Sequence, residues 1–340
     1  MPFRDTAEAT PTLPIRRNLP DVASAAILPG HWLIGALSFS LVAFIWLMVW
    51  TNETVSPLAT GTGTICAAAV IIVAVRYGFR DAASGWPRAA RDFSEYVGLF
   101  GAICLLGAMA SYPIATINHG FADARLAAID HELRFDWIAW YDMVAAHPSL
   151  QWLGRGVYDS IFVTPAILLG YFAATGRQGD ARQFILSFWI AAVLTLSLFS
   201  LMPAQGPLAF LWRGPVPYMP ISALYQAELI PALRDHAMHS IDPGQLRGLV
   251  CAPSFHAASA TLFIATAWRA GTLRWPLATL NVAMLVATPV EGTHYFADLI
   301  AGTFVALFAL GSGAALARLA GRRTTTITAN IGEGMTAPQP

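Results

Sequence analysis

Two short motifs carry the side chains best suited to chemistry in this sequence: PSFH at 253–256 and HYFAD at 294–298. In the second, His294 and Asp298 are four residues apart, so on a helix they would share one face and touch. A carboxylate that holds one imidazole nitrogen fixes the tautomer and frees the other nitrogen for nucleophilic attack. The HYFAD motif is therefore a candidate for covalent catalysis, and His256 of the PSFH motif is a candidate for proton transfer.

The residues before His256 predict a helix start that suits an anion. Proline favours the first turn of a helix, and Ser254 is well placed as its N-cap. Free backbone N–H groups and the helix dipole at such a start favour a phosphate group. Either motif alone could be an interfacial histidine at a helix end. Together, opening two spans on the same predicted membrane face, they favour one site.

The two motifs resemble the second and third signature motifs of the type 2 phosphatidic acid phosphatase superfamily. Pro253-Ser254-x-His256 is followed about forty residues later by His294-x-x-x-Asp298. The stretches CAPSFHAA, THYFADLIAG and RFDWIAWYDMVAAHP are similar to its inositolphosphotransferase-like branch, which includes inositol phosphorylceramide synthases. The resemblance covers 94–318 and implies a six-span core.

The resemblance implies a membrane enzyme that hydrolyses or transfers a lipid-linked phosphate ester without a metal or other cofactor. The residue matching His294 attacks phosphorus to give a phosphohistidine, and the residue matching Asp298 orients it. The residue matching His256 protonates the leaving alkoxide and then activates water or a polyol such as inositol. Phe255, where glycine is common in the superfamily, shifts the expectation from a plain phosphatase toward headgroup transfer of the kind used on sphingolipids.

The sequence also departs from the superfamily. Ala287 and Thr288 stand where Ser-Arg is common, and the first motif, Lys-(x6)-Arg-Pro, is absent. Phosphoryl transfer needs positive charge around the equatorial oxygens. The residues that we expect to supply substrate contacts are Arg213, Arg234, Arg247, Ser254 and Gln205. The arginines have an alternative role at the lipid headgroups. Glu291 is expected to face outward or to help deprotonate an acceptor hydroxyl, and Arg155 is expected to pair with Asp159.

The composition predicts the elements that must hold these motifs. Of the 340 residues, 56% are hydrophobic and 12% charged, against about 25% charged in soluble domains. Apolar windows of about 20 residues indicate an all-α, polytopic transmembrane bundle of eight spans. The windows are 32–50, 58–77, 94–117, 155–175, 183–202, 254–271, 273–290 and 295–318. The formal net charge is zero, which gives no case for a nucleic-acid partner, and the chain has no lysine.

The predicted spans divide the chain into four parts. These are a cytoplasmic segment at 1–31, two extra spans at 32–93, the six-span core at 94–320 and a disordered tail at 321–340. Arginines cluster beside alternate span ends, which places both termini in the cytoplasm, with a bacterial inner membrane as the expected location. The long connections 118–154 and 203–253 then lie on the periplasmic side with both motifs. The helical pattern at 133–144 fits a helix lying flat on the membrane or one packed on the bundle.

Two alternatives to a lipid enzyme are a proton-coupled transporter and a superfamily member that has lost activity. A transporter would place ionisable groups near the bilayer midplane and show repeat symmetry between its halves. The polar groups here gather at one predicted face, and we see no repeat. The expected partner is a membrane lipid that reaches His294 laterally, and no oligomeric state is assigned.

Overall fold

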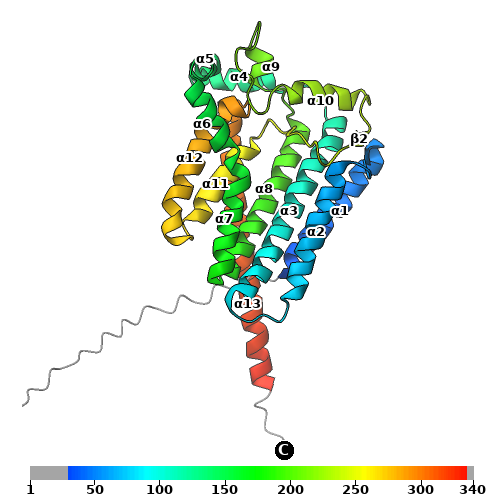
Figure 1. The fold of residues 1–340 in the computed structure, drawn as a ribbon, viewed down its shortest axis with the longest axis vertical. Helices are drawn as coiled ribbons and strands as arrows, with labels where there is room; N and C mark the ends of the chain where they lie inside the picture. Colours follow the sequence, from blue (N-terminus) through cyan, green and yellow to red (C-terminus); the bar gives the residue numbers. More distant parts are fainter. Residues whose placement is uncertain (1–29, 335–340) are drawn as a thin grey trace, which may run out of the picture.

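The regular structure is almost entirely helical, which confirms the predicted all-α bundle (Figure 1). The computed structural model describes residues 30–334. The helices that form the long bundle are α1 (Gly30–Thr51), α2 (Thr60–Gly78), α3 (Gly85–Ile117), α6 (Pro148–Tyr158), α7 (Ser160–Thr175), α8 (Gln178–Leu201), α11 (Phe255–Ala267), α12 (Arg274–Glu291) and α13 (Phe296–Gly334). A short 3-10 turn, Gly271–Leu273, precedes α12.

Six of the described helices are long and apolar enough to cross a membrane, so the chain is an integral membrane protein. They are α1, α2, α3, α8, the Gly271–Glu291 segment that contains α12, and the Phe296–Ala320 part of α13. The pair α6 and α7, bent by 41°, would make a seventh crossing if it counts as one span.

The sixth predicted window, 254–271, differs from a full span. It forms α11, an apolar helix of 13 residues, which rises about 20 Å against a hydrocarbon core of about 30 Å. Hydropathy windows measure apolar length alone, and this stretch is apolar because it is packed among α7, α8, α12 and α13. The prediction of eight full-length spans therefore needs correction at α11.

Close packing fixes the start of α11 against α13. A Cβ atom added at Gly302 would lie 2.2 Å from the carbonyl oxygen of Ser254, so only glycine permits this approach. Along the rest of α11, Phe263 stacks with Phe188 of α8. Helix α11, which carries His256, and helix α13, which follows the turn with His294, are thus held together by direct contact near the two motifs.

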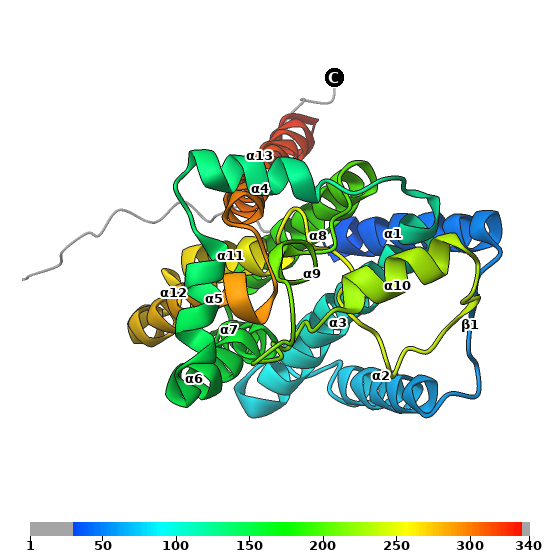
Figure 2. The same cartoon turned by 90° about the horizontal axis from the view of Figure 1, so that it is seen from above.

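A cap of shorter helices lies across one end of the bundle (Figures 1 and 2). Its helices are α4 (Asp123–Glu132), α5 (Trp137–Ala145), α9 (Pro207–Leu211) and α10 (Tyr225–Arg234). In α5, the Trp137 indole donates to the Pro289 carbonyl at 2.8 Å, and the Tyr141 hydroxyl donates to the Tyr218 carbonyl at 2.6 Å. Both rings are buried, so of the two interpretations of this segment the packed helix is correct.

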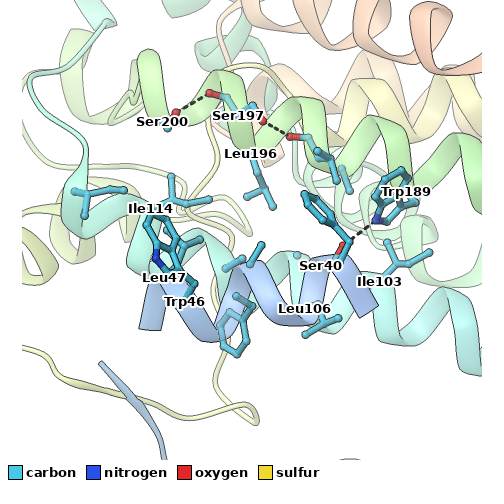
Figure 3. A pocket seen from close by; sticks show the side chains of 18 of the residues that line it. Ser40, Trp46, Leu47, Ile103, Leu106, Ile114, Trp189, Leu196, Ser197 and Ser200 are labelled. Atoms are coloured by element: carbon cyan, nitrogen blue, oxygen red, sulfur yellow. Dashed lines mark hydrogen bonds between the residues drawn. The ribbon is translucent and has the colours of Figure 1, made fainter. Parts of the chain in front are cut away.

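The N-terminal helices α1 and α2 pack along α3. Their connection contains β1 (Thr54–Val55), which pairs in parallel with β2 (Ser240–Ile241) of the cap. A cavity of about 360 Å³ lies between α1, α3 and α8, where Trp189 donates to the Ser40 hydroxyl at 2.8 Å (Figure 3). Its lining is mainly apolar and includes none of the residues of the two histidine motifs.

The C-terminal segment also differs from prediction. Helix α13 continues to Gly334, where a disordered tail was expected from residue 321, because an existing helix propagates at low cost once it has formed. Residues 1–29 and 335–340 lie outside the described part of the chain. The predicted cytoplasmic N-terminal segment falls almost wholly among them.

Candidate active site

The two histidine motifs meet at the capped end of the bundle. His256 lies in the first turn of α11, and its ring centroid is 6.3 Å from that of His294. The side chains of His294 and Asp298 are buried, at 2% and 0% relative exposure. The three residues predicted to do the chemistry are therefore neighbours in the fold, although α12 separates them in sequence.

His294 faces Asp298 from a turn rather than from the same helix. It precedes α13, which begins at Phe296, and the backbone at Thr293 has a φ of 51°. His294 Nδ1 is 3.2 Å from Asp298 Oδ1, yet neither atom meets hydrogen-bond geometry with any partner in the described residues. The contact has ion-pair distance but poor hydrogen-bond alignment.

The other carboxylate oxygen of Asp298 is held firmly. Asp298 Oδ2 accepts from the Tyr295 N–H at 3.1 Å and from the Cys251 thiol at 3.5 Å. The Asp298 carbonyl also accepts from the Ser254 N–H at 3.1 Å. These bonds fix which oxygen faces His294, and they join the start of α13 to the start of α11.

The PSFH motif forms the helix start that the sequence predicts. Ser254 is the N-cap of α11, and its hydroxyl accepts from the Ala257 N–H at 3.3 Å. The first N–H groups of a helix have no intrahelical acceptor, so this end can receive an anion. Ser254 itself is fully buried and its hydroxyl is used in the cap. It therefore shapes the helix start, while the backbone offers the donors.

Two aspartates of α4 brace the site, and the motif search did not find them. Asp130 accepts from the N–H groups of Phe296 and Ala297, at 2.9 and 2.7 Å, and so caps the N-terminus of α13. Asp123 accepts from the Tyr295 hydroxyl at 2.8 Å. The two aspartates are seven residues apart, which on a helix means one face; this spacing was the available signal in the sequence.

Asp130→Ala is expected to lower the melting temperature and to slow turnover several-fold. It leaves two first-turn N–H groups of α13 without an acceptor, and losing such a cap costs about 1 kcal/mol. Asp136→Ala is the matched control, because Asp136 caps α5 through the Ala139 N–H at 3.0 Å. The control should lose stability but not activity. Thermal unfolding and turnover of both purified variants check this, and equal activity losses would contradict the brace.

The predicted arginines do not reach the histidines. Arg234 bonds Asn118 Oδ1 and the Gly120 carbonyl, Arg247 lies over the Tyr225 ring, and the exposed Arg213 bonds the Trp212 carbonyl. Within the described residues, none of these guanidinium groups contacts His256, His294 or Asp298. That they contact the phosphate stays a prediction, and in this fold their guanidinium groups lie against aromatic rings, an amide and carbonyls of neighbouring residues.

Gln205 is placed by its backbone. The N–H groups of Gln205 and Gly206 both donate to the Asp123 carboxylate, at 3.0 Å each. Gly206 has a φ of 92°, and a Cβ added there would lie 2.7 Å from the Thr293 carbonyl oxygen. The loop that carries Gln205 therefore passes directly beside the turn that carries His294, which places this residue nearer the site than the three arginines.

Glu291 faces inward, which corrects the expectation that it points outward. It is 1% exposed, and its Oε1 and Oε2 accept from the Tyr218 hydroxyl at 2.6 Å and the Ile221 N–H at 3.3 Å. Burial and the bond to Glu291 raise the pKa of Tyr218 to about 12, so this hydroxyl keeps its proton. The carboxylate is thus engaged in holding residues 218–222 of the cap.

Arg155 takes part in the same network instead of pairing with Asp159. Its Nε donates to the Tyr218 hydroxyl at 3.0 Å, and its Nη2 donates to the Met219 carbonyl at 2.7 Å. The guanidinium also lies 5.2 Å from the centroid of the Tyr218 ring. Arg155 therefore ties α6 to residues 218–222, the same segment that Glu291 holds from α12.

Cys251, His294 and Asp298 form a buried group whose potential metal-ligand atoms lie within 4.8 Å of one another. Burial, and then the charges of Asp298 and Asp123, raise the pKa of the Cys251 thiol well above its ordinary value. A metal binds the thiolate rather than the thiol. The thiol instead donates to Asp298 and to the Thr293 carbonyl, so the arrangement suits hydrogen bonding better than metal binding.

Comparison with known proteins gives one family match. The family model described as PAP2 superfamily matches residues 124–312, which is more than half of the chain. The match runs from α4 to α13 and includes both histidine motifs, while α1, α2 and α3 lie outside it. No curated protein and no solved structure matches the chain.

Proposed function

The chain belongs to the PAP2 superfamily, and on that premise we propose that it cleaves a lipid-linked phosphate ester through a covalent phosphohistidine on His294. Membership and the six apolar helices fit a membrane lipid phosphatase or phosphotransferase. The observation that carries the proposed mechanism is the buried pair of His294 and Asp298, at 3.2 Å, with the His256 ring beside it. One nucleophile, one orienting carboxylate and one proton donor are thereby assembled at a helix start.

In the first step, His294 Nε2 attacks phosphorus while Nδ1 faces Asp298. The P–N bond forms as the bond from phosphorus to the lipid oxygen breaks, and the leaving alkoxide takes a proton from His256. The carboxylate stabilises the positive charge that develops on the His294 ring. The first-turn N–H groups of α11 supply donors to the equatorial oxygens of phosphorus.

In the second step, an acceptor hydroxyl attacks the phosphohistidine. His256, now neutral, takes the proton of that hydroxyl as the P–N bond breaks, which restores both histidines. Water gives hydrolysis, and a polyol such as inositol or a lipid alcohol gives transfer. We favour transfer, as in the inositol phosphorylceramide synthase-like branch, because Phe255 occupies the position where glycine is common in the superfamily. In this fold the centroid of the Phe255 ring lies 5.4 Å from that of the Phe188 ring on α8.

The proposal places the reaction on the periplasmic face of a bacterial inner membrane, with both ends of the chain in the cytoplasm. The arginine distribution supports this orientation. The cap then covers the site on its aqueous side, so the lipid enters between the helices from the bilayer. Neither motif demands a cofactor.

A panel of lipid phosphates tests the proposal. Purified protein in EDTA should convert at least one of phosphatidic acid, a lysophosphatidic acid or phosphatidylinositol at the same rate as without EDTA, because no step of the proposed mechanism uses a metal ion. With phosphatidic acid, adding inositol should divert the product from free phosphate to inositol phosphate. With phosphatidylinositol, adding ceramide should divert the product from inositol phosphate to inositol phosphorylceramide, and both changes are read by mass spectrometry. Turnover that is lost in EDTA and restored by a divalent cation would overturn the metal-independent step.

A further inference from the structure

The Tyr158 side chain is built into the site, although no motif contains it. Its hydroxyl lies 3.0 Å from His256 Nδ1, and the two rings stack with centroids 4.0 Å apart and an interplanar angle of 17°. Tyr158 ends α6 and is 4% exposed. The same hydroxyl lies 3.3 Å from the Ser222 hydroxyl of the cap. His256 is thus held on one ring face and at one nitrogen by a single buried side chain.

The space for this hydroxyl depends on Gly292. A Cβ atom added at Gly292 would lie 2.9 Å from the Tyr158 hydroxyl and 2.4 Å from Cδ2 of His294. The Tyr158 hydroxyl and the His294 ring can therefore occupy these positions only because residue 292 has no side chain. Such a fit ties the position of His256 to that of the turn carrying His294.

The Ser222 end of this chain of contacts is fixed as well. The Ser222 N–H donates to the Glu291 carbonyl at 2.9 Å, and the Glu291 carboxylate holds Tyr218 and Ile221 on either side. Arg155, one helical turn before Tyr158 on α6, bonds the same cap segment at Met219. Residues 218–222 are consequently a rigid support for Tyr158, anchored at α6 and at α12.

We propose that Tyr158 is the positioning residue of His256 and that it keeps the proton of Nδ1 in place while Nε2 exchanges protons with the reacting oxygens. Nδ1–H donates to the Tyr158 oxygen, and the Tyr158 O–H donates to the Ser222 oxygen. This direction holds in both steps, because only Nε2 gains or loses a proton. The inference rests on the proposed function of His256 as acid and then base.

The two histidines would then have different orienting partners. A carboxylate faces His294, and a neutral hydroxyl faces His256. A hydrogen bond to a charged acceptor is stronger than one to a neutral acceptor, so the carboxylate stabilises a cationic ring more than the hydroxyl does. The ring beside Tyr158 therefore gives up its Nε2 proton more readily, as a general acid must, while the ring beside Asp298 can carry the phosphoryl group.

The test removes only the hydroxyl. With a lipid phosphate, whose alkoxide needs a proton to leave, Tyr158→Phe should lower kcat about 10-fold to 100-fold with little change in KM. With p-nitrophenyl phosphate, the pre-steady-state burst of nitrophenolate should stay within about twofold, since this leaving group needs little protonation. Tyr171→Phe on α7 is the matched control and should leave both rates unchanged.

A double-mutant cycle decides whether Tyr158 acts through His256. In a His256→Ala background, Tyr158→Phe should cause no further loss, because the group that it positions is gone. Additive losses, or equal losses with both substrates, would overturn the assignment. If Tyr158→Phe lowers the melting temperature, the cycle is run with Ser222→Ala instead. This variant should lose less kcat than Tyr158→Phe, and again only with the lipid phosphate. Additive losses with His256→Ala, or equal losses with both substrates, would overturn the assignment here too.

The result separates this inference from the proposed function. A wild-type protein without a burst, or a His294→Ala variant that keeps one, would remove the phosphohistidine step itself. A normal burst and a leaving-group-dependent loss in His256→Ala, with an unaffected Tyr158→Phe variant, would remove only the role of Tyr158.

Discussion

Replacing His294 by alanine is expected to abolish phosphoenzyme formation and turnover together, lowering kcat by about 10⁴-fold or more. In the proposed mechanism the imidazole supplies the atom that bonds to phosphorus, and His294 is the histidine of this site that faces a carboxylate. Its ring neighbour His256 lies beside the neutral Tyr158 hydroxyl, and the Cys251 thiol is bonded to Asp298. Rapid acid-free quenching and mass spectrometry of the labelled protein would detect the phosphohistidine in the wild type and its loss in the variant.

His119→Ala is the matched control for this experiment. His119 is exposed and lies just after α3, outside the site, so its removal should leave both signals unchanged. A phosphorylated species that persists in the His294→Ala protein at wild-type level would show that another residue is the nucleophile.

Asp298→Asn is expected to cost about 10⁴-fold in kcat while the fold is kept. Asparagine can still accept the Tyr295 N–H with its oxygen, which turns its NH₂ group toward His294 Nδ1. That nitrogen must then accept a hydrogen bond, so the proton moves to Nε2, and a protonated Nε2 cannot attack phosphorus. The loss therefore comes from the wrong tautomer of an otherwise intact site.

Nitrogen NMR of labelled histidine reports this tautomer directly, beside the kinetic measurement. Asp142→Asn serves as the control, because Asp142 is exposed on α5. This substitution removes one carboxylate charge outside the site and should leave the tautomer of His294 unchanged. An Asp298→Asn protein that keeps more than about a tenth of wild-type kcat would show that the 3.2 Å contact does not govern His294.

The sequence predicted the features that depend on local spacing. The apolar windows predicted the helical membrane bundle. The spacing in HYFAD predicted the contact between His294 and Asp298, which forms although His294 lies in a turn before the helix. The PSFH motif predicted the N-cap at Ser254 because capping is decided within four residues. These features need no knowledge of how distant segments pack.

The features that local spacing does not predict depend on tertiary packing. The short helix α11 passed as a span because burial against other helices and burial in lipid give the same hydropathy. The arginines were placed by their side of the membrane, yet Arg234 and Arg247 lie over Phe121 and Tyr225 of their own cap. Tyr158 and His256 are 98 residues apart, so no local pattern could pair them.

The shortness of α11 also sets how far inside the bundle His256 lies. Its C-terminal end adjoins the start of α8, because Arg269 bonds Asp180 at 3.0 Å and Gln183 at 2.7 Å. From that common end α8, with 24 residues, rises about 36 Å, whereas α11, with 13 residues, rises about 20 Å. His256 therefore stands roughly 16 Å short of the far end of α8 if the two run alongside each other. In the proposed reaction, the phosphate group of the lipid would enter the bundle below the end of α8 to reach His256. The acyl chains of the lipid could then stay in the hydrocarbon layer of the bilayer.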